Sequence, residues 1–412
     1  MEILGSTFLT TWTLTVIDFL LLICGLVAVW FYGYAIHAAI AWLNCPTPVE
    51  PNFHPPISIL KPICGLDSDA YENLASFCQQ DYPTYQIIFA VLESTDPGIE
   101  VVQKIIHYFP QVDIELVISD RTIGNNRKVS NLANAVTKAR YDTLLIADSD
   151  IRVGTDYLQR VVQPLREERV GVVTCLYRSL ASGWVARLEA LGIATDFHAG
   201  VLVSRKLEGI KFAMGSTILI RTTVLEKIGG FEAIADYLAD DFQLGNLPTQ
   251  AGYKVVLSDY VVEHVLASTT LVDSLRRQIR WARGTRVCRP WGYLGLIFTH
   301  GTVTSLLLLI ATGESTLGWI FLGITWMARL VMGWVVGVRS LDDPVAKKFL
   351  WLIPLRDLIG FAIWCYSFMG NRIEWRGKDW RLTKGGKLVA ISHESARRFA
   401  TSMLANHPNS KI

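Results

Sequence analysis

The chain has 412 residues, of which 51% are hydrophobic and only 18% are charged, and its formal net charge is +2. Soluble proteins average about 25% charged residues, so this composition excludes a disordered or collagen-like chain and argues against a wholly soluble one. The near-neutral total gives no sign of nucleic-acid binding, and we expect no nucleic-acid partner. The seven cysteines are scattered and form no CxxC pair, which is typical of reduced thiols in a protein that faces the cytosol.

The first 50 residues (1–50) are predicted to form a membrane anchor and a short linker. Residues 19–49 contain no Asp, Glu, Lys or Arg, and about 20 apolar residues suffice to cross a bilayer. A cleaved signal peptide is the alternative, but the start of the chain lacks a basic segment and the apolar run is too long for one. We therefore expect residues 14–36 to be an uncleaved signal anchor.

Three more apolar runs predict C-terminal membrane segments within residues 291–371. The runs cover residues 290–313, 316–338 and 349–369. Arg329 interrupts the middle run, and Arg356 and Asp357 lie near the start of the last one. Ionisable side chains inside a membrane are costly and usually face protein or a polar cavity. Arg356 and Asp357 therefore indicate either an ion pair or a broken, re-entrant helix that lines a path for lipid.

Basic residues around these runs predict the orientation in the membrane. Clusters of Arg and Lys precede residue 290, follow residue 338 and fill the tail, residues 372–412. Positive charge favours the cytosolic side of a membrane, so we expect an integral membrane protein whose globular part and basic tail face the cytosol. One N-terminal span, one hairpin and one partly inserted segment over residues 349–371 satisfy this arrangement.

Residues 51–270 are predicted to be an α/β domain. Short apolar runs alternate with stretches of helical spacing, which is typical of a mostly parallel, Rossmann-like sheet covered by helices on both faces. The expected strands are 57–60, 87–92, 114–118 and 143–147, and the expected helices are 70–80, 98–108 and 128–139. No G-x-G-x-x-G follows a strand and no P-loop motif occurs, which argues against a dinucleotide-binding domain and a P-loop enzyme. Ligands of such sheets bind beyond the carboxyl ends of the strands.

Acidic residues follow two of these strands. Asp96 comes after the strand 87–92, and Asp148 and Asp150 come directly after the strand 143–147. A D-x-D pattern alone is often only a solvated loop, but two carboxylates at the end of a buried strand are suitable ligands for Mg²⁺ or Mn²⁺. Such a metal stabilises charge on a leaving phosphate.

Two further patterns have both a structural and a functional interpretation. Asp240 and Asp241 precede an expected helix, where they either interact with the helix dipole or supply a general base. Six arginines and no acid lie between residues 276 and 289. They form either a basic helix on anionic lipid headgroups or a set of guanidinium groups that binds a diphosphate.

The order of these motifs resembles a known family. The series is Lys61-Pro62, Asp96, Asp148-x-Asp150, Asp240-Asp241 and Arg277-x-x-Arg280-Trp281. It resembles the D, DxD, D, (Q/R)xxRW series of membrane-anchored, inverting GT-A glycosyltransferases, and more closely the ceramide glucosyltransferase family with its bacterial relatives, including those associated with hopanoid clusters. The resemblance runs from about residue 57 to residue 281 and extends to Glu374-Trp375-Arg376-Gly377. Some animal members have Asp-Ser-Gly where this chain has Asp148-Ser149-Asp150, which favours a bacterial relative.

The resemblance implies that residues 51–270 are a GT-A catalytic domain, with a UDP-sugar as donor and Mg²⁺ or Mn²⁺ as cofactor. The residues implied on the donor side are Lys61, Pro62, Asp96, Lys128, Asp148 and Asp150. Among them, Asp96 would bind the uracil or ribose and Lys128 would reach a phosphate. Asp148 and Asp150 would bind the metal and, through it, the diphosphate.

On the acceptor side, the resemblance implies that Asp241 deprotonates the acceptor hydroxyl. The residues implied to hold the departing UDP and the acceptor end of the site are Arg277, Arg280 and Trp281. They belong to a predicted basic interfacial helix over residues 271–290. His198 falls where the family carries a functional histidine, and it has either that role or one in packing.

Our first hypothesis for the function is transfer of glucose from a UDP-sugar to the head-group hydroxyl of ceramide or a similar membrane lipid. The alternatives are transfer of N-acetylglucosamine to a phospholipid, as in hopanoid-linked relatives, and transfer to diacylglycerol. A processive polysaccharide synthase would need a translocation channel, which three or four membrane segments make doubtful. A non-enzymatic scaffold would have lost the catalytic acids that this chain keeps. The sequence does not indicate the oligomeric state.

Overall fold

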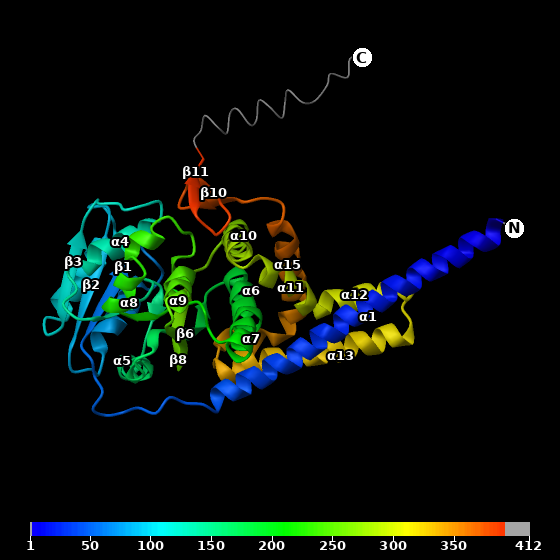
Figure 1. Cartoon of the computed structure of the whole chain (residues 1–412), viewed down its shortest axis with the longest axis horizontal. Coiled ribbons are helices and arrows are strands. Elements are labelled where there is room, and N and C mark those ends of the chain that lie inside the picture. The colour runs from blue at the N-terminus through cyan, green and yellow to red at the C-terminus, as the bar shows by residue number, and fades with distance from the viewer. Residues whose placement is uncertain (1, 392–412) are drawn as a thin grey trace, which may run out of the picture.

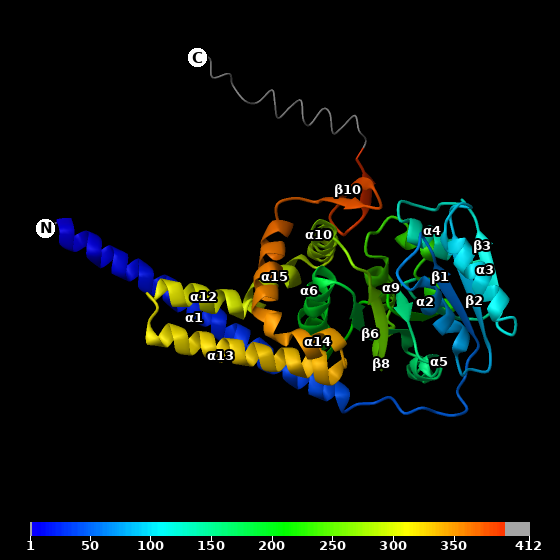
Figure 2. The ribbon, with the colours of Figure 1, turned by 180° about the vertical axis from the view of Figure 1, so that it is seen from behind.

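A computed structural model describes residues 2–391 of the chain, with side chains described from residue 16 onward (Figure 1). An α/β domain lies at one end and a bundle of long helices extends away from it (Figures 1 and 2). A small C-terminal sheet lies close to α10, between these two parts. Residues 392–412 of the predicted basic tail lie outside the described residues.

The α/β domain is built on an eight-stranded sheet of order β3-β2-β1-β4-β7-β6-β8-β5. The strands are β1 Ile57–Pro62, β2 Tyr85–Val91, β3 Asp113–Ile118, β4 Thr143–Ile146, β5 Ile151–Arg152, β6 Val170–Ala181, β7 Ile218–Arg221 and β8 Lys254–Leu266. β1 to β4 are parallel, β7 runs antiparallel to both β4 and β6, and β6 and β8 are parallel. The predicted α/β fold with a mostly parallel sheet is confirmed, and β1 to β4 are the four expected strands.

Helices cover both faces of this sheet because side chains of the strands alternate between two apolar clusters. Ile57 and Ile59 point into the cluster beneath α2 (Ala70–Ser76), α3 (Gly98–Tyr108) and α5 (Tyr157–Val161). Leu60 points into the other cluster, with α4 (Arg127–Val136), α7 (His198–Glu208), α8 (Thr222–Lys227) and α9 (Asp240–Gln250). The three predicted helices exist, although the first ends at Ser76 and continues as a 3-10 turn over Phe77–Gln79.

The remaining helices connect the α/β domain to the bundle. Near the sheet lie α6 (Trp184–Gly192), a π-helical turn over Ile193–Phe197 that leads into α7, α10 (Leu271–Cys288) and α11 (Pro290–Gly295). The bundle that extends away consists of α1 (Glu2–Leu43), α12 (Gly301–Ala311) and α13 (Thr316–Gly333). α14 (Pro344–Phe349) and α15 (Ile353–Ser367) lie at its base, where α15 runs across the bundle beside α6 and α10 (Figure 2). A second π-helical turn, Trp334–Ser340, extends α13.

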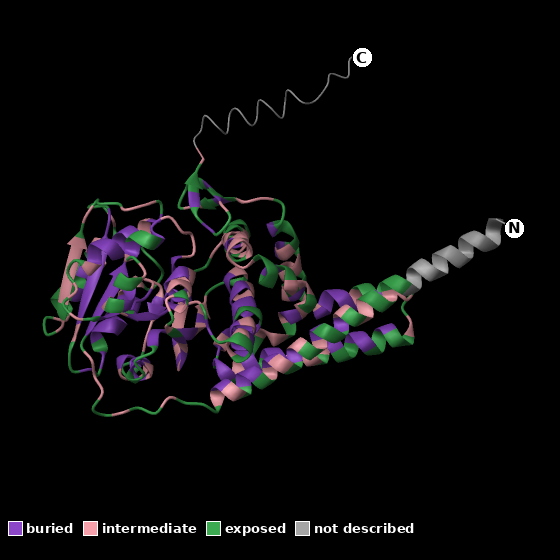
Figure 3. Ribbon diagram, in the orientation of Figure 1, coloured by how far each residue is buried: buried purple, intermediate pink, exposed green. Residues whose placement is uncertain are grey.

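Three helical stretches among the described residues are long and apolar enough to cross a membrane. They are Val16–Leu43, Thr316–Ser340 and Pro344–Ser367. The helix pair Pro290–Thr299 and Gly301–Ala311 is bent by 52° and makes a fourth if it counts as one span. This bend lies in the run 290–313. In the last run a 3-10 turn, Leu350–Leu352, separates α14 from α15. Outward faces of α1, α12 and α13 are exposed (Figure 3) and carry large apolar side chains, as expected of surfaces that contact lipid.

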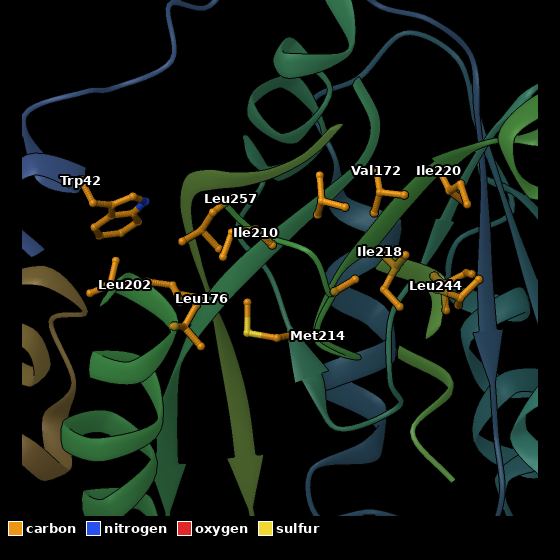
Figure 4. Packing of buried hydrophobic residues seen from close by; sticks show 14 of the residues in the cluster. Trp42, Val172, Leu176, Leu202, Ile210, Met214, Ile218, Ile220, Leu244 and Leu257 are labelled. Carbon is orange, nitrogen blue, oxygen red and sulfur yellow. The ribbon is translucent and has the colours of Figure 1, made fainter. Parts of the chain in front are cut away.

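One buried face of the C-terminal half of α1 packs first against α12 and α13 and then, toward Trp42, against the α/β domain. Ala28, Tyr32, Ala35, Ala39 and Trp42 follow one another at helical spacing and are almost completely buried. The Trp42 indole donates a hydrogen bond to the backbone oxygen of Ser258 (3.3 Å). Its ring lies beside the core side chains of β6, β8 and α7 (Figure 4). The anchor therefore packs directly against the sheet domain.

A buried ion network joins the bundle to the π-helical turn before α7. The Arg329 guanidinium donates to Asp357 (2.9 Å) and to Asp196, and Thr302 donates to the same Asp357 carboxylate. The proposed Arg356–Asp357 ion pair is therefore wrong, because adjacent residues on a helix point in different directions. Asp357 instead pairs with Arg329 of the neighbouring helix α13.

The described part of the predicted tail is a small antiparallel sheet. Its strands are β9 Arg372–Trp375, β10 Lys378–Leu382 and β11 Leu388–Ala390. Its apolar face packs on Leu238 and Val287, and the backbone of Leu238 donates to the oxygen of Gly386 (3.0 Å). These residues are thus part of the folded protein rather than a free tail.

Removal of the Arg329 side chain should destabilise the protein strongly. Arg329→Ala leaves the buried Asp357 without its cation, and loss of one partner of a buried ion pair costs about 3–5 kcal/mol of unfolding free energy. Arg339→Ala is the matched control, since Arg339 follows on the same helical segment but is exposed and has no ion pair among the described residues. Thermal unfolding in detergent should show a large loss for Arg329→Ala alone, and equal melting temperatures for the two variants would contradict the network.

Candidate active site

Residues that were predicted from the sequence come together where β1 and β4 end. Because β1 pairs in parallel with β2 and β4, their carboxyl ends share one edge of the sheet. Lys61 and Pro62 end β1, and the Lys61 ammonium group donates to the backbone oxygen of Asp148 (2.6 Å) in the loop after β4. Burial lowers the pKa of Lys61 to about 7, although Asp148 and Asp150 act in the opposite direction.

Lys128 connects two acids of the site. Its ammonium nitrogen lies 2.7 Å from Asp148 Oδ1 and 3.0 Å from Asp240 Oδ2. Asn126 positions it, since the Asn126 side chain caps α4 at its first turn and donates to Asp240 Oδ1 (3.2 Å). Burial opposes the charge on Lys128, but the two carboxylates raise its pKa well above the usual range. The lysine is therefore a permanent cation between the loop after β4 and the start of α9.

Asp241 is held in the first turn of α9. Its Oδ1 accepts from the Phe242 backbone N–H (2.7 Å) and its Oδ2 from the Gly215 backbone N–H (3.2 Å). The Gly215 oxygen in turn accepts from the Asp148 N–H (3.0 Å), and a Cβ on Gly215 would lie only 2.4 Å from an Asp148 carboxylate oxygen. Burial raises the pKa of Asp241 to about 6, and the charge of Asp240 adds to this effect. Asp241 is thus a carboxylate that can take up a proton near neutral pH.

The Asp148 and Asp150 carboxylates fit a divalent cation that shares its ligands with a substrate. His264 Nε2 lies 3.3 Å from Asp150 Oδ2, and it lowers the pKa of Asp150 despite the opposing effect of burial. The other oxygen of each carboxylate makes no hydrogen bond or ion pair with another described residue. No group of three His, Cys, Asp or Glu side chains suited to a metal occurs in the described part of the chain. Water and phosphate oxygens would therefore have to complete the ligand set, as is usual for Mg²⁺.

Asp96 lies beyond the end of β2 and shapes two loops. Its Oδ2 accepts from the Gly65 N–H and its Oδ1 from the Gly98 N–H, both at 2.8 Å. The carboxylate therefore ties the loop after β1 to the start of α3. Each oxygen keeps a second lone pair, so this structural role leaves room for the expected contact with a nucleoside.

Aromatic rings and two histidines form one wall of the site. The Tyr177 ring lies 4.5 Å from the His198 ring and 5.3 Å from the His264 ring, measured between centroids, and Phe197 packs beside them. His198 is completely buried, and burial lowers its pKa to about 3. It is therefore neutral, and its ring packs against those of Tyr177 and Phe197. Burial raises the pKa of the Tyr177 hydroxyl, and the charges of Asp241 and Asp150 act in the same direction.

The arginines of α10 differ in their partners. Arg277 makes two parallel hydrogen bonds of 2.7 Å to the buried carboxylate of Glu189 on α6. Arg280 makes no hydrogen bond or ion pair within the described chain, and burial together with the nearby Arg277 and Arg376 lowers its pKa to about 10. Trp281 is 42% exposed on the same helix.

Three other arginines of this cluster contact the C-terminal sheet or the segment that leads into it, whereas Arg289 pairs with Glu208 of α7. Arg283 donates to the backbone oxygen of Arg372, Arg286 donates to that of Gly370 (3.0 Å), and Arg276 pairs with Glu374 (3.6 Å). These contacts are made with protein, so only part of the cluster is left for lipid headgroups or a diphosphate.

Four residues of the site were not predicted from the sequence: Tyr177, Glu189, Gly215 and His264. Tyr177 and His264 lie on the long strands β6 and β8, where ordinary alternation of side chains gives no functional signal. Glu189 lies within an apolar helix, where a lone acid is a useful signal of a buried partner. Gly215 has no sequence signal, because its role depends on close approach of the Asp148 carboxylate.

Comparisons with known proteins show which family the chain resembles. The family model described as glycosyl transferase family 21 matches residues 20–388. Ceramide glucosyltransferase 1 of Caenorhabditis elegans is 26% identical over 379 residues, which cover 88% of this chain and 78% of that protein. Ceramide glucosyltransferase 3 of the same organism is 25% identical over 350 residues, which cover 81% and 74%.

A solved structure shares the fold. The mannosyltransferase of Pyrobaculum calidifontis, in complex with GDP-Man and Mn²⁺, superposes with a TM-score of 0.52 and 18% sequence identity. The match covers 86% of this chain and 96% of that one. It supports the GT-A fold of the α/β domain.

Arg277 and Arg280 should differ in their effect on stability. Arg277→Ala leaves the Glu189 carboxylate buried without a cation, so we expect unfolding free energy to fall by about 2–5 kcal/mol. Arg280→Ala removes a side chain with no ionic partner among the described residues and should leave the melting temperature nearly unchanged. Thermal unfolding of both variants is the measurement, and a larger loss for Arg280→Ala would refute the structural role of Arg277.

Proposed function

The chain belongs to glycosyl transferase family 21, and we propose that it transfers a sugar, in the first instance glucose, from a UDP-sugar to the head-group hydroxyl of ceramide or a ceramide-like lipid. The observation that carries this proposal is the pair of links that meet at Asp148, through Lys128 to Asp240 and through the Gly215 backbone to Asp241. A metal-binding pair and a titratable base at one edge of a sheet, next to apolar helices, suit a membrane-bound glycosyltransferase.

The donor side of the reaction uses the carboxyl ends of β1, β2 and β4. Asp148 and Asp150 would hold Mg²⁺ or Mn²⁺, which would supply charge stabilisation to the departing diphosphate. Lys61 and Lys128 add positive charge behind the same loop. Asp96 and Pro62 lie beside the space for the nucleoside. No second carboxylate is needed as a nucleophile, because UDP is already a good leaving group.

The acceptor side uses Asp241. We propose that it takes the proton of the acceptor hydroxyl while the hydroxyl oxygen attacks the anomeric carbon and the bond to UDP breaks, so the product has inverted configuration. General base catalysis contributes roughly 10²- to 10⁴-fold to rate. The pKa of about 6 suits this role, because the carboxylate is mostly ionised at neutral pH and still accepts a proton readily.

The helical bundle supports a lipid acceptor. Its exposed apolar surfaces suit a bilayer, and the Arg329 network joins it to the π-helical turn before His198. We therefore propose that the chain is an integral membrane protein with the catalytic domain in the cytosol. A head group that reaches from the bilayer past Tyr177 and Phe197 would approach Asp241, with Arg280 and Trp281 on the α10 side.

A transfer assay tests the proposed function. Purified full-length protein in detergent is incubated with Mg²⁺ or Mn²⁺ and labelled UDP-glucose or UDP-N-acetylglucosamine, with ceramide, phosphatidylethanolamine and diacylglycerol offered separately. Label in ceramide from UDP-glucose is the expected result, with Asp241→Asn as inactive control. Label in a phospholipid from UDP-N-acetylglucosamine would contradict the proposed donor and acceptor but would be consistent with the proposed site residues. No transfer to any lipid would contradict the proposed function.

The pH dependence of transfer should report Asp241. Activity requires the ionised carboxylate, so kcat/KM should rise with pH through about 6 and level off above it. Asp240→Asn removes a neighbouring negative charge that raises the pKa of Asp241, so the rise should move to lower pH. The shift of the profile is measured from initial rates between about pH 5 and 8, roughly the range over which such a carboxylate titrates. A rise that stays in place or moves to higher pH would contradict the assignment.

A further inference from the structure

A cleft lies between the catalytic domain and the C-terminal sheet. Its volume is about 410 Å³. Asp120, Asn125 and Arg127, from the ends of β3 and the start of α4, line one side, and Trp375 and Arg376 from the β9–β10 hairpin line the other. One lining residue, Arg127, directly precedes Lys128 in the sequence. The two sides of the cleft come from segments that lie far apart in the chain.

Two guanidinium groups near this cleft have no anionic partner. Arg280 and Arg376 lie 5.8 and 5.6 Å from the centroid of the same Trp375 ring. Neither makes an ion pair or a side-chain hydrogen bond within residues 16–391. The two positive charges repel each other, and the burial of Arg280 makes this repulsion stronger. Two unpaired cations around one aromatic ring are therefore suited to an anion with more than one charge.

The cleft is connected to the expected metal loop through the start of α4. Arg127 lines the cleft, and Lys128 after it contacts Asp148 (2.7 Å). Burial raises the pKa of Asp67, which accepts a hydrogen bond from Ser149 of that loop, and the charge of Arg376 opposes this rise. An anion bound between Arg376 and Arg280 would thus lie next to the loop that is expected to hold a metal–phosphate group.

The backbone at Arg376 argues that the arginine is present for its side chain. Trp375 and Lys378 are paired across the hairpin, and Arg376 and Gly377 form the two-residue turn with φ of +51° and +71°. Positive φ at both positions is the type I′ turn, which favours Asn-Gly. An arginine in the left-handed region is uncommon, and such residues cluster at functional sites.

The C-terminal sheet holds this turn rigidly against the site. The Leu388 N–H donates to the oxygen of Asp236 (2.7 Å), and the Asn125 side chain donates to the oxygen of Leu388 (3.1 Å). These contacts reach the segments that lead directly into Asp240 and into α4. The sheet therefore fixes the hairpin relative to both halves of the catalytic machinery.

We propose that Arg376, together with Arg280 beside the same Trp375 ring, binds the diphosphate of the nucleotide sugar, so that the C-terminal sheet completes the donor site. This inference rests on the proposed function for the identity of the donor. Arg376 is then a further substrate-binding residue, contributed by a segment outside the α/β domain.

The test is binding of UDP, UMP and inorganic pyrophosphate to the full-length protein with Mg²⁺, measured by calorimetry. Arg376→Asn removes the charge and creates the Asn-Gly pair that suits the turn, so its melting temperature should equal or exceed that of the unchanged protein. Its Kd for UDP and pyrophosphate should rise about 10- to 100-fold, the usual effect of losing one charge-assisted contact, and its Kd for UMP should rise less. Arg381→Asn, an exposed arginine on β10, is the control and should bind as before.

The outcomes separate this inference from the proposed function. Tight UDP binding that is equal in Arg376→Asn and the unchanged protein would overturn the role of Arg376 and leave the proposed donor intact. Pyrophosphate binding that depends on Arg376, with UDP no tighter than pyrophosphate, would support the role and overturn the uridine donor. Absence of binding to all three probes would overturn both.

Discussion

The charge balance around Lys128 is the constraint on which the site depends. Its ammonium group lies between Asp148, in the loop after β4, and Asp240, at the start of α9, and it is itself almost buried. Buried carboxylates that approach each other without a cation would repel, and one of them would take up a proton. Lys128 therefore lets the expected metal loop and the start of α9 lie close together. Gly215 links Asp148 to Asp241, the expected base, through its backbone. The chemistry proposed here follows from this arrangement.

Two further links connect the site to the apolar helices and to the C-terminal sheet. The Arg329 network connects α13 and α15 to the turn before His198, and the buried face of α1 packs on the sheet domain. On the other side, arginines of α10 hold the C-terminal sheet against the segments that deliver Lys128 and Asp240. The catalytic domain is thus connected to the apolar helices by buried polar contacts, and a lipid head group would have a defined approach to Asp241.

The strands and the acidic residues of this site could be predicted from the sequence, but the residues that pair with each other in space could not. β1 to β4 could be predicted because buried parallel strands are unbroken apolar runs, and the acids because they follow those strands. Partners were harder, since Glu189 lies 88 residues from Arg277 and nothing in the spacing joins them. The sequence suggested an ion pair between Asp357 and its neighbour Arg356. Adjacent residues on a helix point in different directions, and Asp357 pairs with Arg329 instead. The C-terminal sheet was interpreted as a basic tail because its apolar positions are few and lie between charges.

The anomeric configuration of the product tests the central claim, a single displacement assisted by Asp241 alone, most directly. The donor UDP-glucose is α-linked, and the glycolipid formed from it can be examined by proton NMR. The account predicts a β-linked sugar, recognised by the large coupling constant of the anomeric proton. An α-linked product would contradict it, because retention requires a second displacement or a nucleophile on the opposite face of the sugar, and Asp241 would then not be the base.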